Sequence, residues 1–242
     1  MESVLFTSSI IPPALPRSYN TQMKTERWIN FIVSETETSL ALLYSYMQFQ
    51  KLLSHQDNVD KIDKNSEFWM LHNGAVQHSL FLYLGRLTDD SADGKSFADF
   101  SKHCIKNIHD FSRTEFLVRK PDILSSNPRF MENKTEPNEA DMRVLFKLAR
   151  PHNGFLRGAC RDIRNKVFAH AILVEEHEYA DLFSKVNLDS IEKALLVYWS
   201  ISQHLWQSFY NARTLDPIQL EYSRKEDISK NIVQMVHATN LA

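Results

Sequence analysis

Residues 161–170 are the part of this sequence best suited to chemistry on a phosphodiester. They read Arg-Asp-Ile-Arg-Asn-Lys-Val-Phe-Ala-His, so that Arg164 and Asn165 precede His170 by six and five residues. A histidine with a pKa near the ordinary value of about 6.5 can exchange a proton with a ribose 2′-hydroxyl or a leaving 5′-oxygen. An arginine can hold the scissile phosphate through two parallel hydrogen bonds and stabilise the charge that develops on it. If the chain cleaves RNA, His170 would be the general acid/base and Arg164 the phosphate ligand, and Asn165 could fix either side chain by a hydrogen bond.

Positive charge accumulates around this segment. Lys166 lies four residues before His170, and Arg157 and Arg161 lie four residues apart ahead of it. Arg157 and Arg161 belong to a longer series of basic residues with steps of four, three, seven, four and three residues: Arg143, Lys147, Arg150, Arg157, Arg161 and Arg164. Such a series predicts that Arg157, Arg161 and Lys166 bind the RNA backbone. The alternative interpretation is a solvated helix face whose charges are partly neutralised by neighbouring helices.

A helical pattern surrounds the segment and sets the directions of its side chains. At about 100° per residue, apolar residues four, three and four positions apart share one side of a helix. They predict a core-facing stripe of Leu156, Cys160, Ile163 and Val167. His170 lies at the edge of this stripe, about 120° from Arg164, so the two side chains do not meet on one regular helix. A second copy of the chain could bring them together; the alternative is that His170 is a packed core histidine.

Two blocks of the sequence are similar to one known family. Arg164-Asn165-Lys166, running into Ala169-His170, resembles the signature of the HEPN superfamily, an arginine followed by a polar residue and, a few positions later, a histidine. The block from Phe68-Trp69 to Leu84-Gly85-Arg86-Leu87-Thr88-Asp89 resembles, together with the first, the abortive-infection AbiU-type branch. In this order the two blocks extend the resemblance over residues 25–212.

The resemblance implies a metal-independent endoribonuclease of a bacterial toxin or phage-defence system. Such an enzyme cleaves RNA by attack of the 2′-hydroxyl and leaves a 2′,3′-cyclic phosphate and a 5′-hydroxyl, without a metal or cofactor. The resemblance also implies a homodimer whose motif helices pair. Single-stranded or loop RNA is the expected substrate, because its unstacked bases and flexible backbone can enter a helical cleft. Ile172 departs from the family, because the AbiU branch tends to carry an acid there and some other HEPN proteins a modified tyrosine.

A second interpretation keeps the fold and removes the catalysis. In it the chain is a non-catalytic HEPN module that binds RNA, a nucleotide or a protein partner, and the motif serves packing. An antitoxin or another defence protein is the partner that the resemblance suggests. The two interpretations differ in whether His170 faces an open basic cleft or a closed core.

Composition predicts an all-α protein. The 242 residues are 43% hydrophobic but include only 5 Gly and 8 Pro, which disfavours a turn-rich β fold. The two cysteines, Cys104 and Cys160, give no disulfide framework, and the ten histidines show no metal-ligand spacing, so no metal is expected. No apolar run reaches the roughly 18 residues of a membrane helix, and the N-terminus is a poor signal peptide. A cytoplasmic protein that does not span a membrane is therefore expected.

The elements that must position the motif form an antiparallel HEPN-like bundle of long helices. We expect an extended N-terminal arm, residues 1–22, and a single helical domain, residues 23–242. A long helix is expected from Thr25, then a connector over residues 54–64. A second helix, capped by Asn65 or Ser66, should bury the stripe Phe68, Ala75, Ser79, Leu82 and Arg86. If Arg86 is buried it needs an acidic partner, either Asp89, Asp90 or a carboxylate elsewhere, which favours a structural clamp over a phosphate contact.

The second half of the bundle follows from caps and breaks. Ser96 should cap a helix that runs to Asn107, and residues 109–137 are expected to be irregular. A helix from Asn138 should break at Pro151, before the motif helix that runs to Ala171. Asp189 and Glu192 predict a capping box for a helix ending at Asn211, and a last helix should begin near Arg224.

Overall fold

The computed structural model describes residues 17–89, 95–127, 129–132, 134, 136–169, 181–213 and 220–238. All regular structure in these ranges is helical, which confirms the all-α class. The long helices are α1 (Arg17–Leu53), α3 (Ser66–Leu87), α11 (Leu188–Asn211) and α12 (Lys225–Ala238). The shorter elements are α2 (Gln56–Asp63), α4 (Phe97–Lys106), η1 (Ile108–Phe111), α5 (Arg113–Arg119), α6 (Ile123–Ser126), α7 (Glu139–Lys147), α8 (Arg150–Phe155), η2 (Leu156–Cys160), α9 (Arg161–Ile163) and η3 (Arg164–Ala169).

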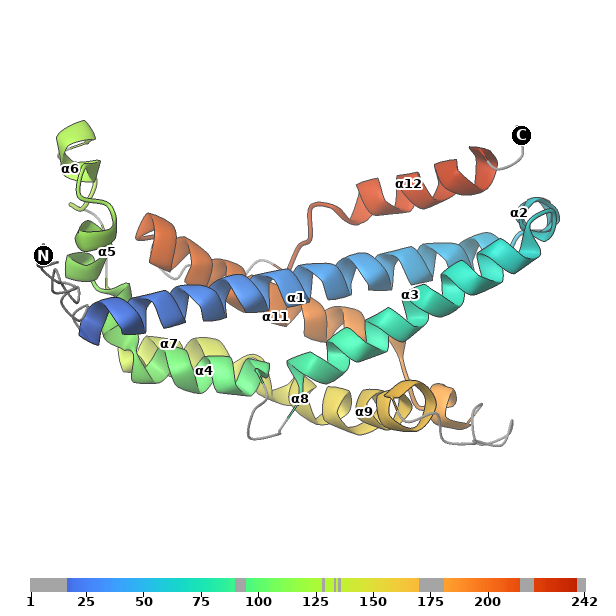
Figure 1. Cartoon of the computed structure of the whole chain (residues 1–242), viewed down its shortest axis with the longest axis horizontal. Coiled ribbons are helices and arrows are strands. Elements are labelled where there is room, and N and C mark those ends of the chain that lie inside the picture. The colour runs from blue at the N-terminus through green and yellow to red at the C-terminus, as the bar shows by residue number, and fades with distance from the viewer. Residues whose placement is uncertain are drawn as a thin grey trace, which may run out of the picture.

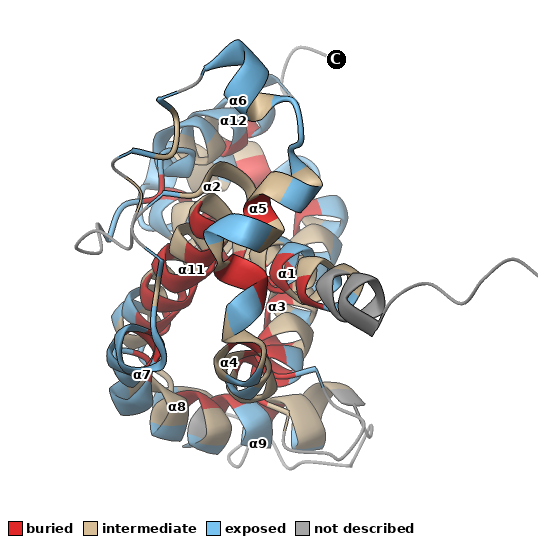
Figure 2. Ribbon diagram, turned by 90° about the vertical axis from the view of Figure 1, so that its left-hand side faces the viewer, coloured by how far each residue is buried: buried red, intermediate tan, exposed pale blue. Residues whose placement is uncertain are grey.

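Helix α1 runs along the molecule, and the other long helices pack against it. Figure 1 shows α3 and α11 beside α1, with α12 on one side of it and α8 and α9 on the other. The main core lies between these helices and α4, and its fully buried side chains include Ile32, Leu84, Phe100 and Ile201. Figure 2 shows the buried residues facing the interior of the bundle. The apolar surface of α1 is thereby removed from water, which is the main source of stability for such a helix.

A second apolar cluster closes the end of the bundle where α1 meets α2. It consists of Phe49, Leu52, Ile62, Trp69, Ile232 and Val236, contributed by α1, α2, α3 and α12. The rings of Phe49 and Trp69 stack with their centroids 5.6 Å apart. The expected connector over residues 54–64 is wrong for Gln56–Asp63, because burial of Ile62 in this cluster stabilises α2.

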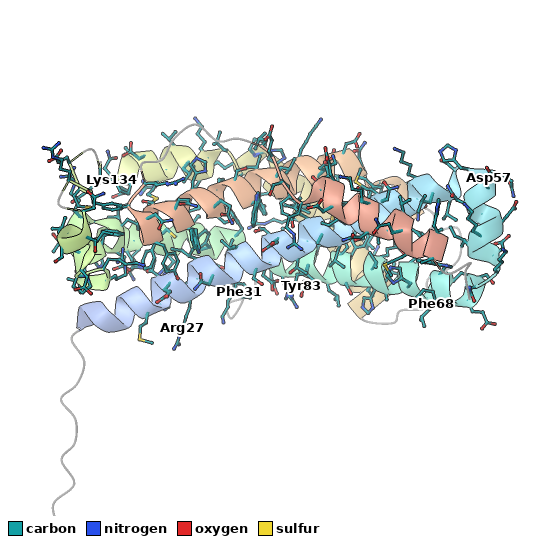
Figure 3. The ribbon with its side chains drawn as sticks, turned by 90° about the horizontal axis from the view of Figure 1, so that it is seen from above. Arg27, Phe31, Asp57, Phe68, Tyr83 and Lys134 are labelled. Atoms are coloured by element: carbon teal, nitrogen blue, oxygen red, sulfur yellow. The ribbon has the colours of Figure 1, made fainter. Side chains whose placement is uncertain are left out.

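The core-facing residues of α3 differ from the expected stripe. Trp69, Leu80, Phe81, Leu84 and Leu87 are buried, together with Gly85. By contrast, Phe68 is 51% exposed and projects away from the bundle in Figure 3. Helix α3 packs on α1 and also on the motif segment. A single stripe drawn through Phe68 therefore misses its broad buried surface.

Helix boundaries confirm some of the expected caps and correct others. Ser96 accepts a hydrogen bond from the Asp99 N–H, and Asn138 forms a capping box with Asp141, so α4 and α7 begin where expected. Helix α11 begins earlier than expected, because the Asn187 side chain accepts from the Ser190 N–H at 2.9 Å. The Asp189 capping box is therefore wrong.

Two segments expected to be irregular contain helices. Helix α1 begins at Arg17, inside the expected arm, because no proline follows Pro16 until Pro121; residues 1–16 lie outside the described residues. Residues 109–137 contain α5, α6 and most of η1. Arg119 of α5 donates to the carbonyls of Asp110 and Phe209, which ties this region to α11. None of the described helices is both long and apolar enough to cross a membrane.

Candidate active site

The motif lies on a continuous helical segment made of α8, η2, α9 and η3, in which η2 and η3 are π-helical. In a π-helix each N–H bonds to the carbonyl five residues earlier, so the turns are wider than α turns, and such turns are frequent at functional sites. The expectation of a regular α-helix is therefore wrong here, and the offset of about 120° between Arg164 and His170 does not apply. The core stripe is confirmed, because Leu156, Cys160 and Ile163 are fully buried and Val167 packs against the core.

The catalytic histidine of the sequence prediction, His170, lies outside the described residues, as does Ile172. The described part of the motif ends at Ala169 and contains Arg164, Asn165 and Lys166. The described part of the candidate site is therefore its arginine side.

Arg164 crosses the surface of α3 at Gly85. A Cβ added to Gly85 would lie 2.1 Å from Cδ of Arg164, 2.8 Å from its Nη1 and 3.0 Å from its Nε. These distances are far below van der Waals contact, so only a residue without a side chain allows Arg164 this path. The two sequence blocks that carry the family resemblance thus meet at one contact between α3 and η3.

Asn165 fixes the guanidinium of Arg164 from the other side. The Nε–H of Arg164 donates to Oδ1 of Asn165 at 2.9 Å. Within the described ranges Arg164 forms no ion pair with a carboxylate, although it is half-buried. A half-buried cation without an acidic partner retains donors for an anion, because arginine presents five N–H groups and Asn165 uses one. Of the two hydrogen bonds that the sequence leaves open for Asn165, to the arginine or to the histidine, the structure shows the one to Arg164.

The neighbouring Arg86 has a different role. Its Nε and Nη2 donate to the two carboxylate oxygens of Glu35 in α1 at 2.8 and 2.9 Å, and its guanidinium lies 4.0 Å from the centroid of the Tyr83 ring. The structural clamp is confirmed, with Glu35 as the carboxylate elsewhere in the chain. This pairing links α1 to α3 one residue after Gly85 and gives Arg86 a carboxylate partner.

An aromatic cluster holds the end of η3 against α3. The ring of Phe168 stacks on His78 and on Phe81, with centroid distances of 5.0 and 5.8 Å, and it meets Phe183 edge-on. Phe168 therefore anchors the chain two residues before His170. His78, to which the sequence prediction gives no catalytic role, contacts the motif segment through this stacking on Phe168.

The predicted RNA-binding cations divide into two groups. Arg161 and Lys166 are exposed, whereas Arg157 is half-buried and its charge acts on Tyr198. Burial raises the pKa of the Tyr198 hydroxyl, and the positive charge of Arg157 opposes that shift. The remaining members of the series, Arg143, Lys147 and Arg150, line a separate pocket between α4, α7 and α8.

The cysteines are not suited to nucleophilic chemistry. Burial raises the pKa of the Cys160 thiol to about 12, and burial together with the charge of Asp110 raises that of Cys104. Both thiols are therefore protonated at neutral pH, and a protonated thiol is a poor nucleophile. Among the described residues, no three side chains of His, Cys, Asp and Glu are grouped to hold a metal ion.

Sequence reasoning missed Gly85 as part of the site and Glu35 as the partner of Arg86. Glycine inside a helix costs about 1 kcal/mol relative to alanine, so an interior glycine is itself a signal of close packing. Gly85 carried that signal, but its contact lies far away in the sequence. Glu35 carried none, because an acidic residue on a long helix is most often solvated.

The family match of the chain agrees with the resemblance seen in the two sequence blocks. The model of the HEPN-type AbiU2 family matches residues 24–230, which is most of the chain, and confirms the resemblance to AbiU-type HEPN domains. No curated protein and no solved structure matches the chain.

Proposed function

Because the chain belongs to the AbiU2 family of HEPN domains, we propose that it is a metal-independent endoribonuclease of a bacterial toxin or phage-defence system. The observation that carries the proposal is Arg164, a half-buried arginine held by Gly85 and Asn165 that has no carboxylate partner in the described ranges. Arg86, one residue after Gly85 in α3, differs from Arg164 because it donates hydrogen bonds to the carboxylate of Glu35. Arg164 therefore has the charge and the donors for a scissile phosphate.

The proposed reaction is a transesterification within RNA. The 2′-oxygen forms a bond to phosphorus while the bond from phosphorus to the 5′-oxygen breaks, which gives a 2′,3′-cyclic phosphate and a 5′-hydroxyl. One imidazole accepts the proton of the 2′-hydroxyl and another donates a proton to the leaving oxygen. Two copies of the chain, paired through their motif helices, would supply two His170 side chains. Arg164 stabilises the negative charge that develops on the phosphate oxygens.

The basic side chains near Arg164 would bind the phosphate backbone of the RNA. Arg161 and Lys166 flank Arg164 and are exposed, and Arg157 precedes them on η2. Together they would bind the backbone of a single strand or loop, whose affinity should then fall steeply with salt.

The decisive experiment measures RNA cleavage by the purified protein in the presence of EDTA. His170→Ala and Arg164→Ala should be inactive with melting temperatures close to that of the wild type, and Arg164→Lys should recover only part of the activity, because an ammonium lacks the guanidinium fork. Arg27→Ala is a matched control, since Arg27 is exposed on α1 and projects outward in Figure 3. Full activity in His170→Ala would end the assignment of this motif as a nuclease site. Solution scattering at micromolar concentration tests the homodimer, which a monomeric result would exclude.

One observation favours a second function. Phe168 packs against His78 and Phe81, so the chain leading to His170 is anchored in an aromatic cluster. In a non-catalytic HEPN module, which binds RNA, a nucleotide or a protein partner such as an antitoxin, His170 would continue that cluster. His170→Ala would then leave a cavity and lower the melting temperature by several degrees, the effect of about 1 kcal/mol. RNA binding without cleavage by the wild-type protein would identify this function.

A further inference from the structure

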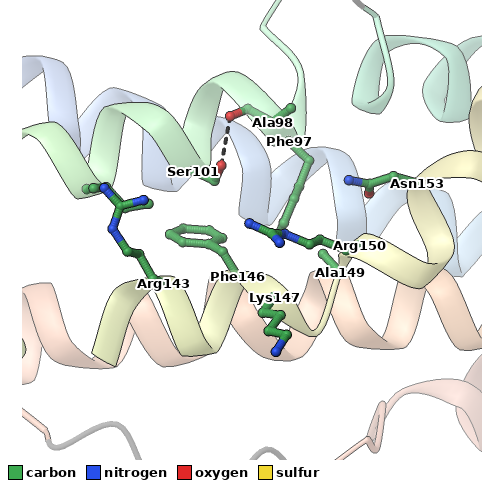
Figure 4. Close-up of a pocket in the computed structure, with 10 residues that line it drawn as sticks. Phe97, Ala98, Ser101, Arg143, Phe146, Lys147, Ala149, Arg150 and Asn153 are labelled. Atoms are coloured by element: carbon green, nitrogen blue, oxygen red, sulfur yellow. Dashed lines mark hydrogen bonds between the residues drawn. The ribbon is translucent and has the colours of Figure 1, made fainter. Parts of the chain in front are cut away.

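A pocket of about 180 Å³ lies between α4, α7 and α8, apart from the motif. Its floor is apolar and includes Phe97, Phe146 and Ala149, and its rim carries Arg143, Lys147 and Arg150. In Figure 4 the guanidinium of Arg150 extends toward Phe97, and Arg143 stands on the other side of the Phe146 ring. Among the residues that the structure describes, no acidic side chain lines the pocket. Its electrostatic character is therefore positive, over an aromatic floor.

The floor and one polar wall of the pocket are held by a buried side chain. The rings of Phe97 and Tyr198 stack with centroids 4.0 Å apart and planes 7° from parallel. The Tyr198 hydroxyl donates to Oδ1 of Asn153. This hydrogen bond orients the amide, and in Figure 4 the Asn153 nitrogen points toward the space beside Arg150. The pocket thus presents one amide N–H donor from a position that the core fixes.

The charge of the pocket is largely uncompensated. Arg150 and Lys147 form no hydrogen bond or ion pair with any residue in the described ranges. Arg143 pairs with Glu139 in the same helix, but both side chains are exposed, and such a pair contributes little and can be displaced. Arg150 and the Asn153 amide therefore lie on one side of the pocket, Arg143 lies across the Phe146 ring, and Lys147 extends from the rim away from Phe97. No carboxylate among the described residues lines this space.

We propose that this pocket binds one phosphodiester unit of an RNA strand whose scissile phosphate lies at Arg164; this inference rests on the proposed function. The donors suit phosphate oxygens, and the apolar floor suits a sugar or a base lying over Phe97 and Phe146. A volume of about 180 Å³ equals roughly six water molecules at about 30 Å³ each. It is below the roughly 300 Å³ of the smallest typical pockets for a whole ligand, so it suits one unit of a longer chain.

The position of the pocket fits a strand that continues to the motif. Arg150 precedes Arg164 by fourteen residues on the same helical segment, a distance of at most roughly 21 Å, the length of that many residues of α-helix at 1.5 Å each, because the wider π turns of η2 rise less per residue. Arg157 and Arg161 lie between them. A single strand several nucleotides long would thus contact cations along α8, η2 and α9, with the pocket as a distal anchor for its backbone.

The test measures binding rather than cleavage, so that its outcome is separate from that of the nuclease assignment. All proteins carry His170→Ala, and fluorescence anisotropy follows a labelled single-stranded RNA over a series of salt concentrations. Adding Arg150→Gln and Lys147→Gln should weaken binding on the order of tenfold at low salt and reduce the salt slope by about 1.4, the value for two lost contacts to single-stranded RNA. Adding Lys64→Gln and Lys230→Gln instead should change neither, because these exposed lysines lie on the side of the bundle formed by α2 and α12.

Competitors of different length distinguish the sources of the phosphate. A dinucleotide is too short to reach from Arg164 to the pocket, so the two pocket substitutions should weaken its binding much less than that of the longer strand. Equal affinity and salt slope in the pocket variant and the lysine control would overturn the proposal. A second outcome would also overturn the proposal: the protein binds AMP or inorganic phosphate saturably, and the pocket variant loses this binding but keeps its RNA affinity. The ligand of the pocket would then be a free small anion. If the protein with His170 intact does not cleave RNA while the pocket substitutions still lower the salt slope, the pocket stands without the nuclease.

Discussion

Arg164 lies so close to the backbone of Gly85 that a methyl group added there would come within 2.1 Å of its Cδ. The contact joins η3 to α3 and leaves Arg164 one path across the helix. Since Asn165 holds the Nε of the same guanidinium, the direction of the charge is set by residues on two helices. The glycine is therefore part of the site, although it has no side chain.

Replacing Gly85 with alanine should displace Arg164 and lower RNA cleavage on the order of a hundredfold, the effect of losing one preorganised charge-stabilising group. The fold should survive, because the atoms in the way belong to a side chain that can move, and alanine adds up to about 1 kcal/mol of helix propensity. Cleavage rates and melting curves check this outcome.

Gly74→Ala is the matched control in the same helix. A Cβ at Gly74 meets no atom within 4 Å, so this variant should gain up to about 1 kcal/mol and cleave RNA normally. Equal cleavage by the Gly85 and Gly74 variants would show that the position of Arg164 does not matter for activity.

The pairing of Arg86 with Glu35 should be asymmetric in its energetics. The side chain of Glu35 is only 10% exposed, whereas that of Arg86 is 49% exposed. Arg86→Met leaves a nearly buried carboxylate without a cation and should cost about 2 kcal/mol, a value lowered by the partial exposure of the pair. Glu35→Gln keeps an acceptor for a guanidinium that water can reach and should cost about 1 kcal/mol. Urea unfolding of both variants measures the difference, and the reverse order would contradict the clamp.

The fold class and the caps of α4 and α7 could be predicted because each depends on a local pattern. Ser96 and Asn138 cap helices through contacts three residues away, and composition alone indicated helices. The cap of α11 was missed because Asn187 and Asp189 are both good capping residues, and only the backbone shows that Asn187 is used. Tertiary contacts were not predictable in the same way. Nothing in the sequence near Arg164 indicates the π turns of η3 or the approach to Gly85.

The stability of the protein should depend on pH through His103. The Thr25 hydroxyl donates to Asp110 at 2.5 Å and contacts Nε2 of His103 at 2.7 Å, so this nitrogen carries a hydrogen and donates. The Asn107 amide donates to Nδ1 at 3.2 Å, a contact that a protonated ring would lose. Burial lowers the pKa of His103, as do the charges of Lys24 and Lys106, while Asp110 acts in the opposite direction.

The lowered pKa of His103 determines how the free energy of unfolding changes with pH. In the unfolded chain His103 titrates near its ordinary pKa of about 6.5, above its folded pKa, so between the two values the unfolded state binds more protons. The free energy of unfolding should therefore be highest above pH 6.5 and fall as the pH falls through that value toward the folded pKa. His103→Gln should be less stable at neutral pH, because it loses the stacking on Trp28, and should show a flatter profile. Some slope should remain, since burial also lowers the pKa of His152. An unchanged slope in His103→Gln would exclude His103 as the titrating group.

Substitutions of Asn165 separate the positioning of Arg164 from its charge. Asn165→Ala removes the acceptor for Nε at 2.9 Å and leaves the guanidinium free to rotate, although Gly85 still allows it to approach α3. One such hydrogen bond contributes about 1 kcal/mol, so cleavage should fall about fivefold to tenfold, much less than in Arg164→Ala. Asn165→Asp keeps the acceptor but adds a negative charge beside the guanidinium, which should compete with the phosphate and raise KM more than it lowers kcat. Steady-state kinetics on both variants, with Lys166→Gln as a neighbouring control that removes exposed charge alone, distinguish the two effects. If Asn165→Ala cleaves RNA as fast as the wild type, Gly85 alone is sufficient to position Arg164.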